Sequence, residues 1–144
     1  MNRKMIRFCI LLFISILLVT GCQMKPGLSL LKTEEGAAPE AVRNFVREQS
    51  GQNGIDLYSD GVHGDYLFLN SMNVKQGEQA VCFIDINCKI TDGTLNIYFS
   101  EKPAEDPSEK INSKLIYKID SAIDYHRIRI FKNGCEISFD VVGA

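Results

Sequence analysis

The chain has 144 residues, of which 45% are hydrophobic and 24% charged, and its formal net charge is −2 at pH 7. That length suits one ordinary small domain with short flanking segments. The basic residues form no stripe and do not alternate with aromatic ones. The composition therefore excludes the phosphate-binding surface that a nucleic-acid partner would require.

The first residues of the chain have the layout of an export signal. Three basic residues precede an apolar run over residues 8–19 that only Ser15 interrupts. Such a run suits the core of a signal peptide and is shorter than the roughly 18 residues needed to span a bilayer. We therefore expect residues 1–21 to be a signal peptide, with a helix over roughly residues 3–20 that packs on nothing.

The end of the apolar run differs from that of an ordinary secretory signal. Such signals end at small residues of the A-x-A kind, but here Thr20 and Gly21 lead directly into Cys22. The sequence VTGC, from Val19 to Cys22, resembles the lipobox of bacterial lipoprotein precursors. In that family the cysteine thiol receives a diacylglyceryl group, a peptidase cleaves before the cysteine, and the new amino group is often acylated.

The resemblance implies lipidation of Cys22 and cleavage after Gly21. It also implies a mature protein held by lipid on the extracytoplasmic face of the cell membrane or outer membrane. The alternative is a signal anchor that spans the membrane and carries an incidental cysteine.

Removal of the signal would leave an acidic protein on a tether. Three of the 16 basic residues and none of the 18 acidic residues precede Cys22, so the formal charge of −2 becomes −5. Residues 22–37 contain Pro26, Gly27 and Gly36 without sustained periodicity, which predicts a lipidated N-terminus and a flexible linker. Fully extended, the linker would reach on the order of 50 Å. Docking of its leucines on the domain or the membrane is the alternative.

The remaining residues, 38–144, are predicted to form one domain that opens with an amphipathic helix. Pro39 suits the first helical position, Glu40 suits the positive first turn, and Gly51 marks the end of the helix. The apolar residues of this segment share one stripe, and its polar face mixes both signs of charge. We therefore expect the helix to cover a sheet face rather than to lie on a membrane.

Beyond Gly51 the hydrophobic pattern alternates as in strands, and turn signals recur about every ten residues. The dipeptides Asp92-Gly93 and Asn133-Gly134 have the composition of type I′ hairpin turns, and a two-residue turn at each separates apolar from polar partners. The predicted apolar pairs are Ile90 with Leu95, Cys88 with Ile97, Ile86 with Phe99, Ile130 with Ile137 and Ile128 with Phe139. The opposite face pairs Asp85 with Ser100, Arg129 with Ser138 and Arg127 with Asp140, and leaves Phe131 opposite Glu136.

Three further segments, residues 55–58, 65–72 and 114–120, have the composition of strands. The run YLFL within 65–72 is apolar on both parities, which predicts a strand buried on both faces, with the helix over one of them. The predicted fold is therefore mainly β: an antiparallel two-sheet β-sandwich of about seven strands with one short amphipathic helix. This generic pattern is similar to the sandwich domains of many small bacterial surface lipoproteins, a likeness that implies no particular activity.

Three of the five cysteines, Cys82, Cys88 and Cys135, lie in the predicted domain. In the predicted strands all three occupy alternating positions whose side chains point to the core, so we expect buried thiols that pack as small apolar residues. Along one straight strand Cys82 and Cys88 would lie about 20 Å apart, too far for a disulfide. A bridge from Cys135 to one of the others is the alternative, because the extracytoplasmic side is oxidising.

One loop, YSDGVHGDY, gathers Asp60, His63 and Asp65 among glycines. These side chains could hold a metal, but the loop lacks the alternating oxygen ligands and distal glutamate of a calcium loop. A tight polar turn is the preferred interpretation. Apart from lipidation at Cys22, the sequence predicts no catalytic, cofactor or metal site.

Three hypotheses for function follow. The preferred one is a membrane-anchored, noncatalytic binding or structural module of the cell envelope, with an envelope protein or polymer as its partner and without a cofactor. The second is a small inhibitor or immunity-type lipoprotein that acts on an envelope enzyme. The third is a metal-assisted hydrolase that uses the carboxylates of Asp60 and Asp65.

Overall fold

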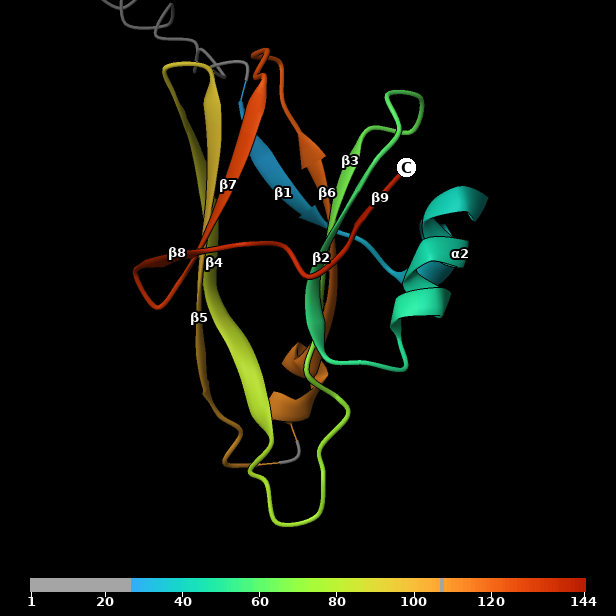
Figure 1. Ribbon diagram of the computed structural model, residues 1–144, viewed down its shortest axis with the longest axis vertical. Coiled ribbons are helices and arrows are strands. Elements are labelled where there is room, and N and C mark those ends of the chain that lie inside the picture. The colour runs from blue at the N-terminus through green and yellow to red at the C-terminus, as the bar shows by residue number, and fades with distance from the viewer. Residues whose placement is uncertain (1–26, 107) are drawn as a thin grey trace, which may run out of the picture.

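A computed structural model describes residues 27–106 and 108–144, which form two β-sheets and one α-helix (Figure 1). The five-stranded sheet has the order β1-β6-β3-β2-β9, with strands β1 (Ser29–Lys32), β6 (Lys114–Asp120), β3 (Asp65–Asn70), β2 (Gly54–Ser59) and β9 (Val142–Gly143). The four-stranded sheet has the order β4-β5-β7-β8, with strands β4 (Val81–Thr91), β5 (Thr94–Pro103), β7 (Arg127–Lys132) and β8 (Cys135–Ile137). Helix α2 spans Glu40–Gln49, and two short 3-10 helices are η1 (Glu35–Ala37) and η2 (Glu109–Ser113). The predicted signal helix, its cleavage site and Cys22 lie outside the described residues.

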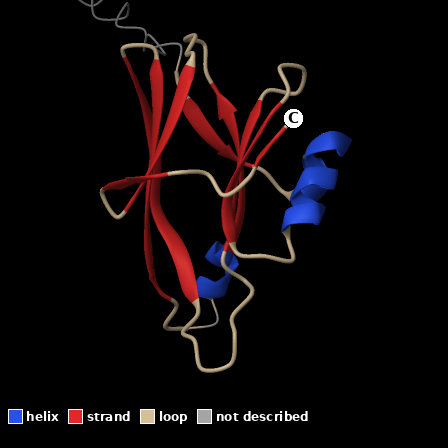
Figure 2. Cartoon of the chain, viewed as in Figure 1, coloured by secondary structure: helices blue, strands red, loops and turns tan. Residues whose placement is uncertain are grey.

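The five-stranded sheet is buried on both of its faces, as β3 shows. Leu67 and Leu69 are fully buried in the core between the two sheets. Tyr66 and Phe68, which alternate with them, pack on the other face in a second cluster that includes the apolar stripe of α2, formed by Val42, Phe45 and Val46. The molecule thus has three layers: helix, five-stranded sheet and four-stranded sheet (Figure 2). This confirms the prediction that a helix covers a strand buried on both sides.

The first predicted hairpin is confirmed near its turn and wrong farther from it. Ile90 pairs with Leu95 and Cys88 with Ile97, and Asp92 (φ 50°) and Gly93 (φ 69°) have the positive φ that a type I′ turn requires. The register then shifts between Ile84 and Asn87, because Asp85 adopts φ 54° and one extra residue enters β4 as a β-bulge. The predicted pairs of Ile86 with Phe99 and of Asp85 with Ser100 are therefore not formed.

The bulge changes which side chains of β4 reach the core. Phe83 and Ile86 both pack against the core between the sheets, although they are three positions apart and would point to opposite faces of a regular strand. The ring of Phe83 packs edge-on against Phe99, with 5.7 Å between ring centroids. Cys82 consequently lies on the opposite face of the strand from Phe83. Its predicted burial is nevertheless confirmed, because Cys82 is only 1% exposed.

The second hairpin is shorter than predicted. Ile130 pairs with Ile137 and Phe131 with Glu136, as expected, but β8 ends at Ile137. The predicted pairs of Ile128 with Phe139, Arg129 with Ser138 and Arg127 with Asp140 are wrong, because the chain leaves the four-stranded sheet after β8 and crosses to the other sheet.

Two strand pairs are parallel, which corrects the prediction of antiparallel sheets. Strand β7 runs parallel to β5, and β9 runs parallel to β2. The cause is the path of the chain: β5 and β7 are joined through β6, which lies in the other sheet, so the chain reverses there before it returns beside β5. The short strands β1 and β9 add to the predicted number.

Strand β1 begins inside the segment that was expected to be a flexible linker. Its register pairs Ser29 with Asp120 and Lys32 with Tyr117 of β6. Leu28 and Leu30 pack against the core between the sheets. Two of the three leucines of the segment 22–37 therefore dock on the domain, whereas Leu31 is exposed, and the pairing of β1 makes Ser29–Lys32 part of the fold rather than of a linker.

Two carboxylates fasten the C-terminal segment to the edge of β2. The backbone N–H of Ile55 donates to Oδ2 of Asp140 (2.8 Å), and the N–H of Val141 donates to Oδ1 of Asp56 (3.1 Å). Backbone bonds between Asp140 and Ile55 and between Leu57 and Val141, both 2.9 Å, complete the contact. Asp56 is only 3% exposed, and its burial, together with the charge of Asp140, raises the pKa of the Asp56 carboxyl.

We predict that Asp56→Asn is at least as stable as the parent protein at pH 7. The folded state binds a proton at Asp56 more tightly than the unfolded chain does, so this site's contribution to the free energy of unfolding falls as the pH rises above the ordinary carboxylate range. Asparagine keeps an oxygen for the N–H of Val141 and carries no charge. Chemical unfolding at pH 7 and pH 4 should show the advantage of the variant shrinking at the lower pH.

Asp124→Asn is the matched control, because Asp124 is exposed. A larger loss of stability for Asp56→Asn at pH 7 than at pH 4 would contradict the effect of burial on this carboxyl.

Candidate functional site

The loop between β2 and β3, residues 60–64, is closed by the carboxylate of Asp60. Its Oδ1 accepts hydrogen bonds from the backbone N–H groups of Val62 (2.9 Å) and His63 (2.7 Å). Its Oδ2 accepts a bond from the hydroxyl of Tyr58 (2.7 Å) and contacts Nδ1 of His63. Gly61 and Gly64 flank the tip with φ of 70° and 86°, a region that favours glycine. This arrangement holds the tip residue, Val62, out from the loop with 83% of its surface exposed.

The hydrogen bonds of the loop set the charge state of Asp60. The bond to the His63 ring, with further bonds from backbone N–H groups and Tyr58, holds the pKa of the Asp60 carboxyl well below its ordinary value. The same carboxylate raises the pKa of the Tyr58 hydroxyl. Asp60 is therefore an acceptor of hydrogen bonds near neutral pH and suits a structural role better than that of a proton donor.

Asp65 has a separate partner on a different loop. Its Oδ2 accepts a hydrogen bond from the hydroxyl of Tyr125, which lies in the connection between β6 and β7. Burial and the neighbouring Asp65 carboxylate both raise the pKa of the Tyr125 hydroxyl. The structure thus joins Asp60 with His63 in one contact and Asp65 with Tyr125 in another. Within residues 27–106 and 108–144 no group of three or more His, Cys, Asp or Glu side chains is arranged to hold a metal ion.

The three cysteines of the domain differ in environment. Cys82 is buried, Cys88 is half-buried and packs against the core, and Cys135 is exposed on the edge strand β8. Burial raises the pKa of the Cys88 thiol, which lowers its reactivity. All three are free thiols, so the alternative of a bridge from Cys135 is not formed, and the expected burial of Cys135 is wrong because β8 lies at a sheet edge.

A row of aromatic and basic side chains crosses the outer face of the four-stranded sheet. The rings of Tyr98 and Phe131 stack with centroids 4.8 Å apart and planes inclined by 16°. The Lys89 ammonium lies 5.3 Å from the centre of the Tyr98 ring, and the Arg129 guanidinium lies 5.2 Å from that of Phe131. Arg129 also donates to Glu136 (2.8 Å). Phe131, which was predicted on the polar face, therefore packs in a row of side chains that links β4, β5 and β7 on a face that no helix of the described residues covers.

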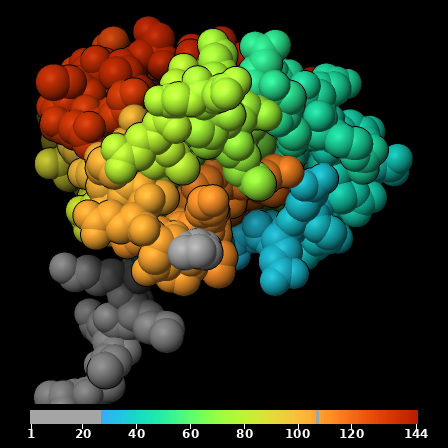
Figure 3. Space-filling view, turned by 90° about the horizontal axis from the view of Figure 1, so that it is seen from below, coloured from blue at the N-terminus to red at the C-terminus, as the bar shows by residue number. Residues whose placement is uncertain are grey.

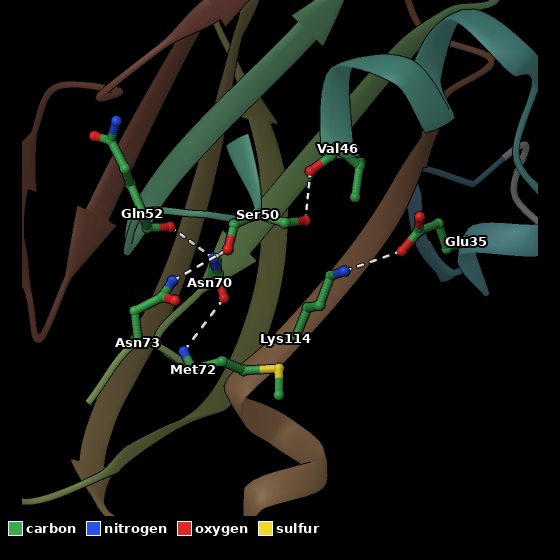
Figure 4. Close-up of polar contacts among 8 residues, drawn as sticks. All are labelled: Glu35, Val46, Ser50, Gln52, Asn70, Met72, Asn73 and Lys114. Atoms are coloured by element: carbon green, nitrogen blue, oxygen red, sulfur yellow. Dashed lines mark hydrogen bonds and ion pairs between the residues drawn. The ribbon is translucent and has the colours of Figure 1, made fainter. Parts of the chain in front are cut away.

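The opposite end of the sheets from the loop of Asp60 is fastened by Asn70, a buried residue at the end of β3. Its amide nitrogen donates to the backbone carbonyls of Ser50 (3.2 Å) and Gln52 (2.6 Å), and its oxygen accepts from the N–H of Met72 (3.2 Å) (Figure 4). The same view shows Lys114 at the start of β6 paired with Glu35 of η1, 2.9 Å apart. These bonds fix the end of α2 and the start of the next connection to the five-stranded sheet.

A hollow of about 270 Å³ opens beside Asn70 at this end. Among its lining side chains are Asn53, Asn70, Ser71, Glu101, Lys132 and Asp140. Each of these six already has an intramolecular partner, including the ion pair between Lys132 and Glu101 at 3.4 Å. The lining therefore consists of groups that hold strand ends together. Asn70 was not predicted as a functional residue. In the sequence it is marked only by its place in the polar residues that follow the apolar run of β3.

Comparison with protein-family models, with curated proteins and with solved structures finds no match to this chain. Among the described residues no helix is both long and apolar enough to cross a membrane.

We predict that Asp60→Asn destabilises the domain at pH 7, because the amide offers a single oxygen where the carboxylate accepts bonds with both. A lowered pKa in the folded state means that ionised Asp60 stabilises the fold above the ordinary carboxylate range and loses this effect as the pH falls through that range. The difference in the free energy of unfolding between the variant and the parent protein should accordingly become smaller on acidification below about pH 4.

Denaturant unfolding followed by circular dichroism at pH 7 and pH 3 measures both effects, with the exposed Asp124→Asn as control. Equal stability of parent and Asp60→Asn at pH 7 would show that the carboxylate does not hold the loop.

Proposed function

We propose that the protein is a lipid-anchored extracytoplasmic lipoprotein whose domain, residues 29–144, is a noncatalytic binding or structural module of the cell envelope. The observation that carries the proposal is the sequence VTGC at Val19 to Cys22, preceded by a basic start and an apolar run that is too short to span a bilayer. Each buried methylene of an acyl chain contributes about 0.8 kcal/mol, so two or more chains on Cys22 would hold the domain stably on a membrane.

The arrangement of the acidic residues supports a noncatalytic role. The two carboxylates that a hydrolase would need, Asp60 and Asp65, accept hydrogen bonds from different partners, Tyr58 and His63 in one case and Tyr125 in the other. Both carboxylates join elements of the fold. Their present geometry suits loop closure better than activation of a water molecule.

Exposed apolar side chains at one end of the sheets support a binding role. Met72 is 60% exposed in the loop that follows β3, and Ile111 is 71% exposed on η2. A backbone bond from Ser71 to Ser113 (2.7 Å) joins the two segments, which lie together on the face in Figure 3. We name this loop, residues 71–80, and η2 the distal end, because Asn70 pairs with Lys114 at one end of β6 while Ser29 pairs with Asp120 at the other. Apolar groups there are open to a protein partner.

We predict that Cys22→Ser blocks processing and anchoring. Serine has no thiol to receive the diacylglyceryl group, so the precursor should retain its signal and the mature form should vanish from detergent-extracted membranes. Immunoblots of fractionated cells, with Cys135→Ser as the matched cysteine control, measure this. An unchanged membrane-bound product from Cys22→Ser would favour a spanning signal anchor and contradict the proposal.

We predict that a photo-crosslinking side chain at Ile111 captures a discrete envelope partner in intact cells. The same side chain at Glu48, which is exposed on α2, is the matched control and should capture far less. Mass spectrometry identifies the adduct, and an envelope enzyme in it would favour the inhibitor-type role. Equal, diffuse labelling from both positions would contradict a binding surface at the distal end.

A further inference from the structure

The chain enters the domain at the same end as two exposed loops. Ser29, the first residue of β1, pairs with Asp120 at the end of β6, and Asp65 at the start of β3 pairs with Ile119. The connection between β2 and β3 and the connection between β6 and β7 therefore both lie at the same end of the sheets as the start of β1, at the top of the molecule in Figure 1. We name these two loops, residues 60–64 and 121–126, the proximal end.

The proximal end lies within short reach of residue 22. Ser29 is seven positions after Cys22, so their Cα atoms are at most about 25 Å apart. Because β1 is paired with β6, this span does not lengthen unless the strand detaches. With lipid on Cys22, the proximal end would face the membrane and the distal end would face away from it.

Each proximal loop displays one exposed apolar side chain in a fixed backbone. Val62 is 83% exposed at the tip that Asp60 closes. Ile123 is 50% exposed, and its backbone N–H (3.1 Å) and C=O (2.7 Å) both bond the hydroxyl of Ser121. The hydrogen bond from Tyr125 joins the second loop to Asp65, the first residue of β3, which directly follows the first loop. Hydrogen bonds thus fix the backbone at Val62 and at Ile123, and neither side chain packs in the two hydrophobic clusters of the described residues.

The charges beside these tips favour an uncharged lipid surface. The carboxylates of Asp60 and Asp65 are engaged within the fold, as described above. Asp92, Asp120 and Asp124 are exposed at the same end, where Lys118 and Arg127 are also exposed, so the exposed carboxylates outnumber the exposed Lys and Arg side chains there. An acidic rim is repelled by anionic headgroups, whereas apolar tips gain from contact with the interface of any bilayer.

We infer that the proximal end rests on the lipid bilayer, with Val62 and Ile123 inserted at its interface, so that the anchored domain stands in one orientation with its distal end outward. The inference depends on the proposed lipid anchor at Cys22.

The chain has no tryptophan, so a single introduced tryptophan reports its own surroundings. We would prepare lipidated Val62→Trp and, as the matched control from the distal end, lipidated Ile111→Trp. Both would be bound to phosphatidylcholine vesicles, with or without brominated acyl chains. The emission of Val62→Trp should shift to the blue and be quenched by the brominated lipid, while that of Ile111→Trp should change in neither respect.

Vesicle flotation separates the two claims. Failure of the lipidated protein to float would contradict the proposed anchor, whereas flotation with equal emission from Val62→Trp and Ile111→Trp would overturn the inference alone. A second reporter, Ile123→Trp, should also be quenched, and adding Val62→Asp to it should reduce the quenching while flotation is retained. Replacement of phosphatidylcholine by phosphatidylglycerol should weaken the quenching of Val62→Trp. Stronger quenching there would overturn the assigned preference for an uncharged surface.

Discussion

Burial of the five-stranded sheet on both faces is the constraint on which the rest of the structure depends. Consecutive residues of β3 alternate between the core shared with the four-stranded sheet and the cluster under α2, and Leu67 and Phe68 are among the most deeply buried residues. A strand with no solvated face needs a layer on each side, which is why one helix and a second sheet both pack against it. Within residues 27–106 and 108–144 no element forms such a layer on the outer face of the four-stranded sheet, where the rings of Tyr98 and Phe131 stack.

The two edges of the five-stranded sheet connect this architecture to function. On one edge, β9 and the carboxylate of Asp140 occupy backbone groups of β2 that would otherwise be open to pairing with another chain, and the carboxylate of Asp56 accepts from the N–H of Val141 in the segment that covers this edge. On the other edge, β1 pairs with β6 from Ser29 onward. The distance from the proposed lipid to the fold is therefore set by a strand register rather than by a long tether. In the proposed arrangement, the orientation of the domain on the membrane follows from the fold.

Sequence reasoning succeeded where local chemistry decides the structure. The turns at Asp92-Gly93 and Asn133-Gly134 fixed the nearest pairs, because turn geometry and side-chain parity agree there. The prediction of strand register failed at Asp85, where a non-glycine residue with positive φ forms a bulge that shifts the pairing of β4 by one residue. The prediction of strand direction failed at β7 and β9, because their parallel pairing depends on the path of the chain between the sheets. Strand β1 was missed because four residues are too few to show a period.

At the candidate site, the preferred interpretation of the loop at Asp60 as a tight polar turn agrees with its hydrogen bonds. The exposure of the Val62 side chain was not predicted, although an apolar residue between the two glycines of the loop could have indicated it. The account as a whole depends on lipid at Cys22, and intact-mass analysis of the mature protein purified from membranes tests this most directly. We expect a polypeptide that begins at Cys22 and is heavier than its amino-acid sequence by a diacylglyceryl group, with or without a further acyl chain. A mature chain with a free, unmodified thiol at Cys22 would contradict the account.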